Sequence, residues 1–306
     1  MEKVKNGQRV RIILEVPPRH GKQISNDVLV PTPDGFKLHG ELKIGDYVYS
    51  PNGKKTKIIN ISEEREDDVR IWFGKKIFVD CHENHEWVVW DRGQHKKRKL
   101  ETKEMEKMDY YKDNRSRFQI DYTKPISGSE KRKFSLHPYV LGVWLGDGKS
   151  DGGTICYSPN DIEHINRIKD IGYKVSSEWT HKTTGVKYIL WKNLSKKLKK
   201  LDLIKNKHIP VSYLFSSKEN RKELLRGLID TDGSVDFDGR VHFVNTNKNL
   251  IFGVKVLAES FGYRTCLTEK EPCLSTSGIQ GTKIVYFLEF CPSDGERMGY
   301  IKRKNK

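Results

Sequence analysis

Two short apolar segments, each closed by an Asp-Gly pair, constrain the fold of this 306-residue chain more than any other feature. The first is VLGVWLGDG at residues 140–148, and the second is LRGLIDTDG at residues 225–233. When the two Asp-Gly pairs are aligned, Asp147 stands opposite Asp232. The interval between them suits an internal duplication of a unit of roughly 80 to 90 residues.

Both segments are apolar almost all round, a pattern typical of a helix that packs on another helix. Gly142 and Gly146 lie on one face of the first helix, as Gly227 and Thr231 do on the second. Small residues at this spacing let two backbones approach closely, so we expect the helices to lie side by side. The alternative is an ordinary apolar seam in which each Asp-Gly pair is only a helix stop signal.

Two helices paired in this way would bring Asp147 and Asp232 to nearly the same point. Like charges repel, and each helix C-terminus already carries partial negative charge, so a divalent cation is needed to offset the cost. Mg²⁺ is the expected cofactor because it prefers carboxylate and water oxygens. Bound to a phosphodiester, it would polarise the phosphate and activate water, which predicts that Asp147 and Asp232 are metal ligands and catalytic groups.

The charge balance points to nucleic acid as the partner. Lys and Arg total 57 against 41 Asp and Glu, a formal net charge of +16. A polyanion is the natural partner of such a chain, although a basic surface kept for solubility alone is the alternative.

Cysteine usage and hydropathy indicate a reducing compartment and no membrane. The five cysteines include no CxxC pair, which indicates neither a disulfide framework nor a zinc ribbon. No stretch has the ~18 to 20 continuous apolar residues of a membrane span, and the N-terminus lacks a signal peptide. We expect a soluble monomer in the cytoplasm of a bacterial or phage-infected cell.

The two nine-residue segments resemble the motif of LAGLIDADG homing endonucleases, and the likeness extends over roughly residues 134 to 300. The resemblance implies a pseudo-twofold domain of two αββαββα repeats that cleaves both strands of a long, asymmetric DNA target. It also implies strands over residues 174–192, 239–246 and 283–290 that read the DNA. The candidate contacts to phosphates or bases, each of which could instead be a solvated surface charge, are Lys174, Lys182, Lys187, Arg240 and Lys283.

Residues 7–22, GQRVRIILEVPPRHGK, resemble the start of a P-loop of phage terminase large subunits. A strand over residues 10–16 is expected to run into the Pro-Pro break. A complete P-loop needs a hydroxyl residue after the lysine and a following helix, but Gln23 and a turn-rich segment come next. The motif is cut off after Lys22, which argues against ATPase activity.

Residues 24–92 predict a compact unit of short strands separated by Asp-Gly and Asn-Gly turns. Residues 93–133 are dense in charge and predict a connector or solvated helix outside any core. The fold class is therefore α+β. The expected parts are a host-protein remnant (1–22), a β-rich splicing-type domain with its connector (23–125) and the endonuclease domain (126–306).

The β-rich part resembles the N-terminal half of a Hint, or intein, domain. NDVLVPTPDGFK is similar to its opening block, and FVDCHENHEWVV to the block with an assisting histidine, which places that role on His85. His85 could also be an ordinary structural residue, or could bind metal with Cys81 and His82. Gln23 stands where an intein has its nucleophile, His82 replaces the usual Thr, and no terminal His-Asn is present.

Splicing within this chain is therefore not expected. Either the chain is the N-terminal partner of a split intein, completed by a separate C-terminal fragment, or it is a relic that keeps only the nuclease. We expect a homing endonuclease. The alternatives are a trans-splicing component with an inactive nuclease and a DNA- or RNA-binding protein that does not cut.

Overall fold

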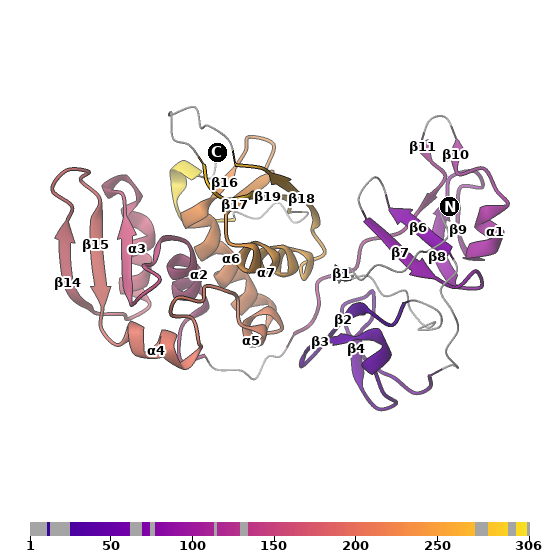
Figure 1. The fold of residues 1–306 in the computed structure, drawn as a ribbon, viewed down its shortest axis with the longest axis horizontal. Helices are drawn as coiled ribbons and strands as arrows, with labels where there is room; N and C mark the ends of the chain where they lie inside the picture. The colour runs from indigo at the N-terminus through magenta and orange to yellow at the C-terminus, as the bar shows by residue number, and fades with distance from the viewer. Residues whose placement is uncertain are drawn as a thin grey trace. The chain divides into compact units, whose positions relative to one another are not determined.

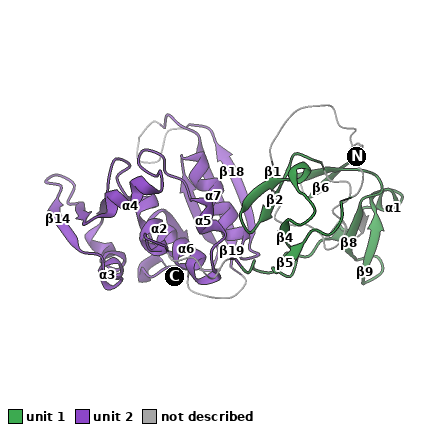
Figure 2. Cartoon of the chain, turned by 90° about the horizontal axis from the view of Figure 1, so that it is seen from below, with its two compact units in different colours: residues 1–127 green, residues 128–306 purple. Residues whose placement is uncertain are grey.

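The computed structural model describes residues 11–12, 25–61, 69–73, 77–112, 115–128, 134–272, 281–292 and 298–304. The chain divides into two compact units, residues 1–127 (unit 1) and 128–306 (unit 2), which are coloured separately in Figure 2. Among the described residues, no helix is both long enough and apolar enough to cross a membrane.

Unit 1 consists of short strands in small sheets, with one short helix (Figure 1). The sheets are β1-β2-β3, β4-β5, β6-β7, β12-β8-β9 and β10-β11. Every pairing is antiparallel except that of β1 with β2. The elements are β1 (Arg11–Ile12), β2 (Val28–Thr32), β3 (Gly35–Leu38), η1 (His39–Glu41), β4 (Tyr47–Tyr49), β5 (Lys55–Lys57), β6 (Val69–Phe73), β7 (Ile77–Cys81), β8 (Glu86–Asp91), β9 (Lys96–Glu101), α1 (Thr102–Glu106), β10 (Tyr111–Lys112), β11 (Arg115–Ser116) and β12 (Phe118–Gln119).

Residues 93–127 of the charged segment 93–133 belong to this unit, and the prediction that the segment lies outside any core is wrong. Strand β9 pairs with β8 in a register that aligns Leu100 with Trp87. The three lysines of β9 are exposed while Leu100 is buried, and Leu100 and Met105 join the buried cluster of Val79, Cys81, Trp87 and Val89. A strand that packs on a core with one face needs apolar residues only among every second position. A high density of charged residues therefore does not exclude a segment from the core.

Unit 2 contains two helices, α2 and α6, that lie between two antiparallel sheets (Figure 1). One sheet has the order β13-β15-β14 and the other β16-β17-β19-β18. The elements are α2 (Pro138–Asp147), β13 (Thr154–Tyr157), η2 (Pro159–Asp161), α3 (Ile162–Asp170), β14 (Val175–Thr180), β15 (Lys187–Trp191), α4 (Leu194–Lys200), α5 (Val211–Leu214), α6 (Lys218–Asp232), β16 (Gly233–Val235), β17 (Val241–Asn245), α7 (Lys248–Glu259), β18 (Arg264–Lys270), β19 (Val285–Cys291) and η3 (Lys302–Lys304).

The two repeats match the predicted αββαββα order only in part. The second repeat runs α6-β16-β17-α7-β18-β19, and residues 302–304 then form the 3-10 turn η3 instead of a final α-helix. In the first repeat, the fully described stretch between α2 and α3 holds the single strand β13, and only an isolated bridge joins Gly148 to Ile155. That stretch, KSDGG, is rich in turn residues, which explains the missing strand.

Candidate functional site

The site is built on the contact between α2 and α6. A Cβ atom on Gly142 would lie 2.4 Å from the carbonyl oxygen of Leu224 and 3.0 Å from the Cα atom of Gly227. A Cβ atom on Gly227 would lie 2.3 Å from the carbonyl oxygen of Tyr139. Side chains larger than hydrogen do not fit at either position, so the two backbones are in direct contact where the sequence predicted a close approach.

Gly146 and Thr231 bring the ends of the two helices together. A Cβ atom on Gly146 would lie 2.0 Å from Oγ1 of Thr231. The Thr231 hydroxyl is buried, and it donates within α6 to the carbonyl oxygens of Gly227 at 3.1 Å and Leu228 at 2.9 Å. The hydrogen bonds of this hydroxyl stay within α6, and the hydroxyl faces Gly146 across the seam.

Asp147 is the last residue of α2 and Asp232 the last residue of α6. Burial and the neighbouring Asp232 carboxylate raise the pKa of Asp147 to about 7. Burial also raises the pKa of Asp232, an effect that Lys207, Asn245 and Lys304 oppose. The two carboxylates therefore interact, and their shared negative charge is poorly solvated, as predicted for a pair that needs a cation.

Different neighbours make the two carboxylates inequivalent. The side-chain amide of Asn245 donates to Oδ2 of Asp232 at 2.9 Å, which favours its ionised form. At the other helix, the thiol of Cys156 donates to the backbone carbonyl of Asp147 at 2.9 Å, and not to its carboxylate. The hydrogen bond from Asn245 therefore stabilises the ionised form of Asp232, while burial and the Asp232 carboxylate raise the pKa of Asp147.

Two lysines that sequence reasoning missed, Lys207 and Lys304, flank the carboxylate pair. Lys207 donates to the carbonyl oxygen of Gly146 at 3.1 Å and lies over the ring of Trp144. Lys304 donates to the carbonyl oxygen of Thr231. Both are half-buried, and burial lowers the pKa of each ammonium while the nearby aspartates oppose that shift.

A small hard cation fits the donor set of the site. Asp147 and Asp232 supply two carboxylates, and burial raises the pKa of both although Lys207 and Lys304 oppose the shift. Within the described part of the chain, no group of three or more His, Cys, Asp or Glu side chains is arranged to hold a metal. Mg²⁺ is commonly held by one or two carboxylates and completes its coordination with water and phosphate oxygens, so two are sufficient.

The five predicted DNA-contact residues all lie in unit 2, and each of the three predicted strand segments contains strand structure. Lys174, Lys182, Arg240 and Lys283 are exposed and lie in turns or strand approaches. Lys187 begins β15, is half-buried and lies 4.0 Å from Glu178, and Arg240 lies 3.5 Å from Asp238. Those two cations are partly neutralised by acidic neighbours.

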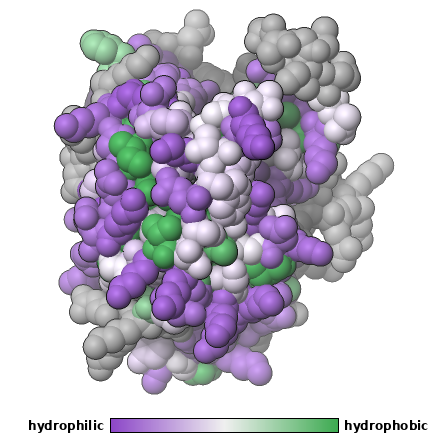
Figure 3. Space-filling view, turned by 90° about the vertical axis from the view of Figure 1, so that its left-hand side faces the viewer, coloured by the Kyte–Doolittle hydropathy of each residue, from purple (hydrophilic) through white to green (hydrophobic). Residues whose placement is uncertain are grey.

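The outer strand β14 is exposed along its whole length. Trp179 on this strand stacks on Tyr188 of β15 with ring centroids 5.6 Å apart, and Lys149 lies over Tyr188 at 4.7 Å. The face of unit 2 on the β14 side is predominantly hydrophilic, with scattered hydrophobic side chains (Figure 3). This surface has the composition of a polar binding face and not of an apolar docking site.

His85 lies in the turn before β8 and is fully buried. Its ring meets Trp87 edge-on at 4.5 Å, and its carbonyl oxygen accepts hydrogen bonds from the backbone and hydroxyl of Thr102. Cys81 contacts the same hydroxyl at 3.7 Å. Gln23, the other splicing-associated residue, lies outside the described residues, so the splicing role of His85 stays a prediction.

With this geometry in place, the second repeat can be compared with known families. Residues 219–289, which include α6, Asp232 and the sheet that follows, match the model of the LAGLIDADG-like domain. This stretch of the chain is similar to the LAGLIDADG-like domain. The matched region covers the second repeat, where the motif LRGLIDTDG is the closer of the two to the family pattern.

Beyond the LAGLIDADG-like domain, the similarity extends over almost the whole chain. Over 323 aligned residues the chain is 31% identical to a protein named replicative DNA helicase DnaB, from Mycobacterium intracellulare. The alignment covers 96% of this chain and 51% of the helicase, so the chain spans about half the length of this curated relative. The predicted terminase host receives no support, because the relative is a helicase and residues 7–22, apart from Arg11 and Ile12, lie outside the described residues.

Among solved structures, similar folds include the homing endonuclease I-DmoI in complex with DNA and Mn. It is 19% identical, with 51% of this chain and 88% of that chain covered and a TM-score of 0.34. The N-terminal LAGLIDADG domain of DUF199/WhiA is 14% identical, with coverages of 52% and 78% and a TM-score of 0.33.

Proposed function

We propose that unit 2 is a site-specific endonuclease that hydrolyses both strands of DNA with a divalent metal. The observation that carries the proposal is the carboxylate pair: α2 and α6 touch along their backbones, end at Asp147 and Asp232, and leave both carboxyl groups with raised pKa values. Perturbed carboxylates flanked by half-buried lysines are typical of catalytic sites. The family model over residues 219–289 supports the same assignment.

In this mechanism Asp147 and Asp232 are the residues that would hold the metal. Mg²⁺ bound by them would supply Lewis acidity at the scissile phosphate and would activate water. Asp147 would bind the metal in its ionised form. Lys207 and Lys304, held near the carboxylates by carbonyl oxygens of the two helices, stabilise the negative charge that develops on the phosphate.

The substrate is double-stranded DNA with an asymmetric sequence. The two repeats differ in strand number and in side chains, so the two halves of the target are read by different surfaces. The exposed Lys174, Lys182 and Lys283 contact phosphates, whereas Lys187 and Arg240 must exchange their acidic partners for DNA. A single chain with both repeats acts as a monomer.

The endonuclease is carried by an intein-like element in a replicative helicase. Support comes from the alignment, which spans nearly all of this chain but only half of the helicase. The target would then be a helicase gene that lacks the element. The Hint-like role of unit 1, with His85 as the assisting histidine, belongs to the same proposal.

The test is a cleavage selection from a library of randomised double-stranded DNA, to which an uninterrupted replicative helicase gene is added. Cut ends formed with Mg²⁺ are captured by ligation and sequenced, with the wild type compared with Asp147→Asn and Asp232→Asn. Asp170→Asn is the matched control, because Asp170 also ends a helix but is exposed. We expect defined double-strand ends from the wild type and the control and none from the other two variants.

Binding of DNA by the wild type without cleavage under any divalent metal would contradict the proposal. That result would assign unit 2 to the non-cleaving nucleic-acid binders. Cleavage that persists in Asp147→Asn and Asp232→Asn would contradict the placement of the site.

A further inference from the structure

Asp230 is a buried carboxylate that the proposed chemistry does not use. It lies on α6 two residues before Asp232 and is 1% exposed. Its oxygens accept hydrogen bonds from the backbone N–H of Tyr300 at 2.8 and 3.1 Å and from that of Ile301 at 3.0 Å. A charged acceptor forms stronger hydrogen bonds to backbone N–H groups than a neutral one does. Asp230 therefore anchors the C-terminal segment 298–304 to α6.

The hydrogen bond from Ile301 to Asp230 fixes the start of the turn in which Lys304 lies. Ile301 is fully buried, and the backbone N–H of Lys304 donates to its carbonyl oxygen at 3.2 Å in the turn η3. One tight turn therefore separates the residue held by Asp230 from the lysine that reaches Thr231 beside the carboxylate pair. Because this connection is short and hydrogen-bonded, the position of Ile301 restricts where Lys304 can lie.

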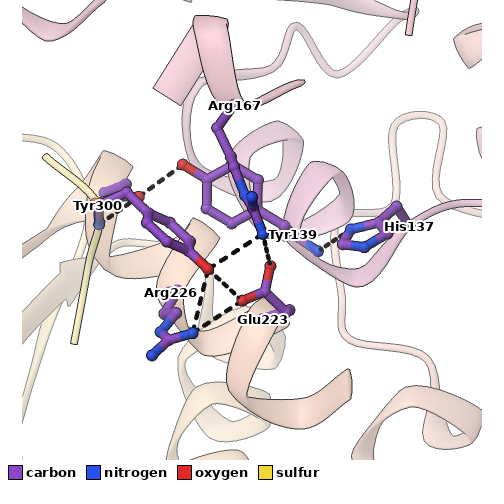
Figure 4. Close-up of polar contacts among 7 residues, drawn as sticks. His137, Tyr139, Arg167, Glu223, Arg226 and Tyr300 are labelled. Carbon is purple, nitrogen blue, oxygen red and sulfur yellow. Dashed lines mark hydrogen bonds and ion pairs between the residues drawn. The ribbon is translucent and has the colours of Figure 1, made fainter. Parts of the chain in front are cut away.

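A second group of contacts holds the same segment further along α6. The hydroxyl of Tyr300 donates to Glu223 at 2.6 Å, and the guanidinium groups of Arg167 and Arg226 contact that hydroxyl at 3.3 and 3.2 Å (Figure 4). The ring of Tyr139, on α2, packs edge-on against Tyr300 with centroids 5.3 Å apart. The segment is thus attached to α6 at two points, through its backbone at Asp230 and through the Tyr300 hydroxyl at Glu223.

The first repeat shows that the helix seam does not require a carboxylate at this place. Alignment of Asp147 with Asp232 sets Leu145 opposite Asp230, and Leu145 is also buried. The hydroxyl of Tyr139 crosses the seam to donate to Asp230 at 2.7 Å. A buried carboxylate carries a desolvation cost that leucine avoids, so its presence in only one repeat calls for a role beyond packing.

We propose that Asp230 is a positioning residue for Lys304: by holding the backbone of residues 300–301 it places the lysine beside the Asp147–Asp232 pair. The proposal rests on the endonuclease function proposed above. Asp230 touches neither substrate nor metal in this scheme and acts only through the C-terminal segment. Small displacements of a reacting or charge-stabilising group cost on the order of 10²-fold in rate.

The test is a double-mutant cycle on the selected DNA site, with Asp230→Leu, Lys304→Met and the double variant. Asp230→Leu reproduces the residue of the first repeat, and Asp230→Asn serves as a milder variant that keeps one acceptor oxygen. The readouts are the single-turnover cleavage rate, the DNA Kd without metal and amide hydrogen exchange at Tyr300 and Ile301. Lys302→Met is the control, since Lys302 is an exposed lysine of the same turn.

We expect each single variant to lose about 10²-fold in cleavage rate with Kd unchanged, and the double variant to lose no more than either. The amides of Tyr300 and Ile301 should lose protection in Asp230→Leu and in part in Asp230→Asn. Independent, multiplying losses in the double variant would overturn the positioning role, as would unchanged cleavage by Asp230→Leu. A wild type that cuts no DNA would instead contradict the endonuclease proposal itself, so the two failures are distinguishable.

Discussion

A Cβ atom placed on Gly142 would lie 3.0 Å from the Cα atom of Gly227, so these two glycines are the point of backbone contact between α2 and α6. We expect Gly142→Ala and Gly227→Ala each to destabilise unit 2 by about 1 to 3 kcal/mol, because the helices must separate to admit a methyl group. Denaturant unfolding measures the loss. Gly152→Ala is the matched control, since a Cβ atom at Gly152 would have its nearest neighbour 3.6 Å away. An equal loss of stability in Gly152→Ala would contradict the close contact between α2 and α6.

Separation of the helices should also affect the site at their ends. Gly146→Ala would set a methyl group 2.0 Å from Oγ1 of Thr231, four residues closer to the aspartates than Gly142 is. At an equal loss of stability, we expect Gly146→Ala to lose more cleavage activity than Gly142→Ala. The reason is that a change at Gly146 displaces the proposed metal-holding carboxylates more directly. Cleavage rates measured below the unfolding temperature of both variants decide the point.

Removal of the Asp147 charge should stabilise the metal-free protein while abolishing its activity. Burial and the Asp232 carboxylate disfavour the ionised form of Asp147, and Asp147→Asn removes that repulsion. We predict a higher Tm at pH 8 without metal and a cleavage rate lower by about 10²-fold or more with Mg²⁺. A lower Tm in this variant would show that the carboxylate pair is not strained.

The raised pKa of Asp147 predicts a specific pH dependence of stability. Its pKa rises from 3.8 to about 7 in the folded protein. A group shifted in this direction contributes stability that is complete below about pH 4 and is lost as the pH rises through about 7. The Tm of the metal-free protein should fall over that range, and less steeply in Asp147→Asn.

Mg²⁺ should reverse this loss at the alkaline end, because it binds the deprotonated carboxylates of the folded state. The increase in Tm on adding Mg²⁺ is expected to grow from pH 5 to pH 8. Parallel pH profiles for the wild type and Asp147→Asn, with or without the metal, would contradict both expectations.

Lys207 is expected to act on the reaction and not on the affinity for DNA. Its ammonium group is half-buried between the carbonyl oxygen of Gly146 and the ring of Trp144. Lys207→Met keeps the length of the side chain and should lower the single-turnover rate by about 10² to 10³-fold. Lys199→Met, at an exposed lysine of α4, is the control; comparable losses in the two variants would point to a general loss of positive charge.

In unit 1, Thr102 holds together the turn that carries His85. Its hydroxyl accepts from the indole N–H of Trp87 at 2.9 Å and donates to the His85 carbonyl oxygen at 3.2 Å. Thr102→Val keeps the shape but leaves the indole N–H without this acceptor, which should cost about 1 to 3 kcal/mol in the free energy of unfolding. Thr56→Val, on the exposed strand β5, should cost far less.

Local patterns in the sequence were sufficient for helices α2 and α6 and for most of the strands. Apolar runs with glycines four residues apart predicted the α2–α6 contact, since a period of 3.6 residues places those glycines on one face. Asp-Gly and Asn-Gly turns predicted short strands over residues 24–92, and strands β2 to β8 lie among the described residues of that stretch. The same local view failed at residues 93–133, where β9 enters the core with one inward leucine among lysines.

What the sequence by itself determined is the pair of motifs, and with them the identity of Asp147 and Asp232 as a candidate site. Only the tertiary structure decided which of the 57 basic residues accompany them. Lys207 precedes α6 and Lys304 lies near the end of the chain, and neither differs in local pattern from its many basic neighbours. Their place beside the carboxylates depends on long-range contacts, such as the hydrogen bonds that the backbone N–H groups of Tyr300 and Ile301 donate to Asp230. Contacts between residues far apart in the chain leave no periodic trace in it, so they become visible only once the chain is folded.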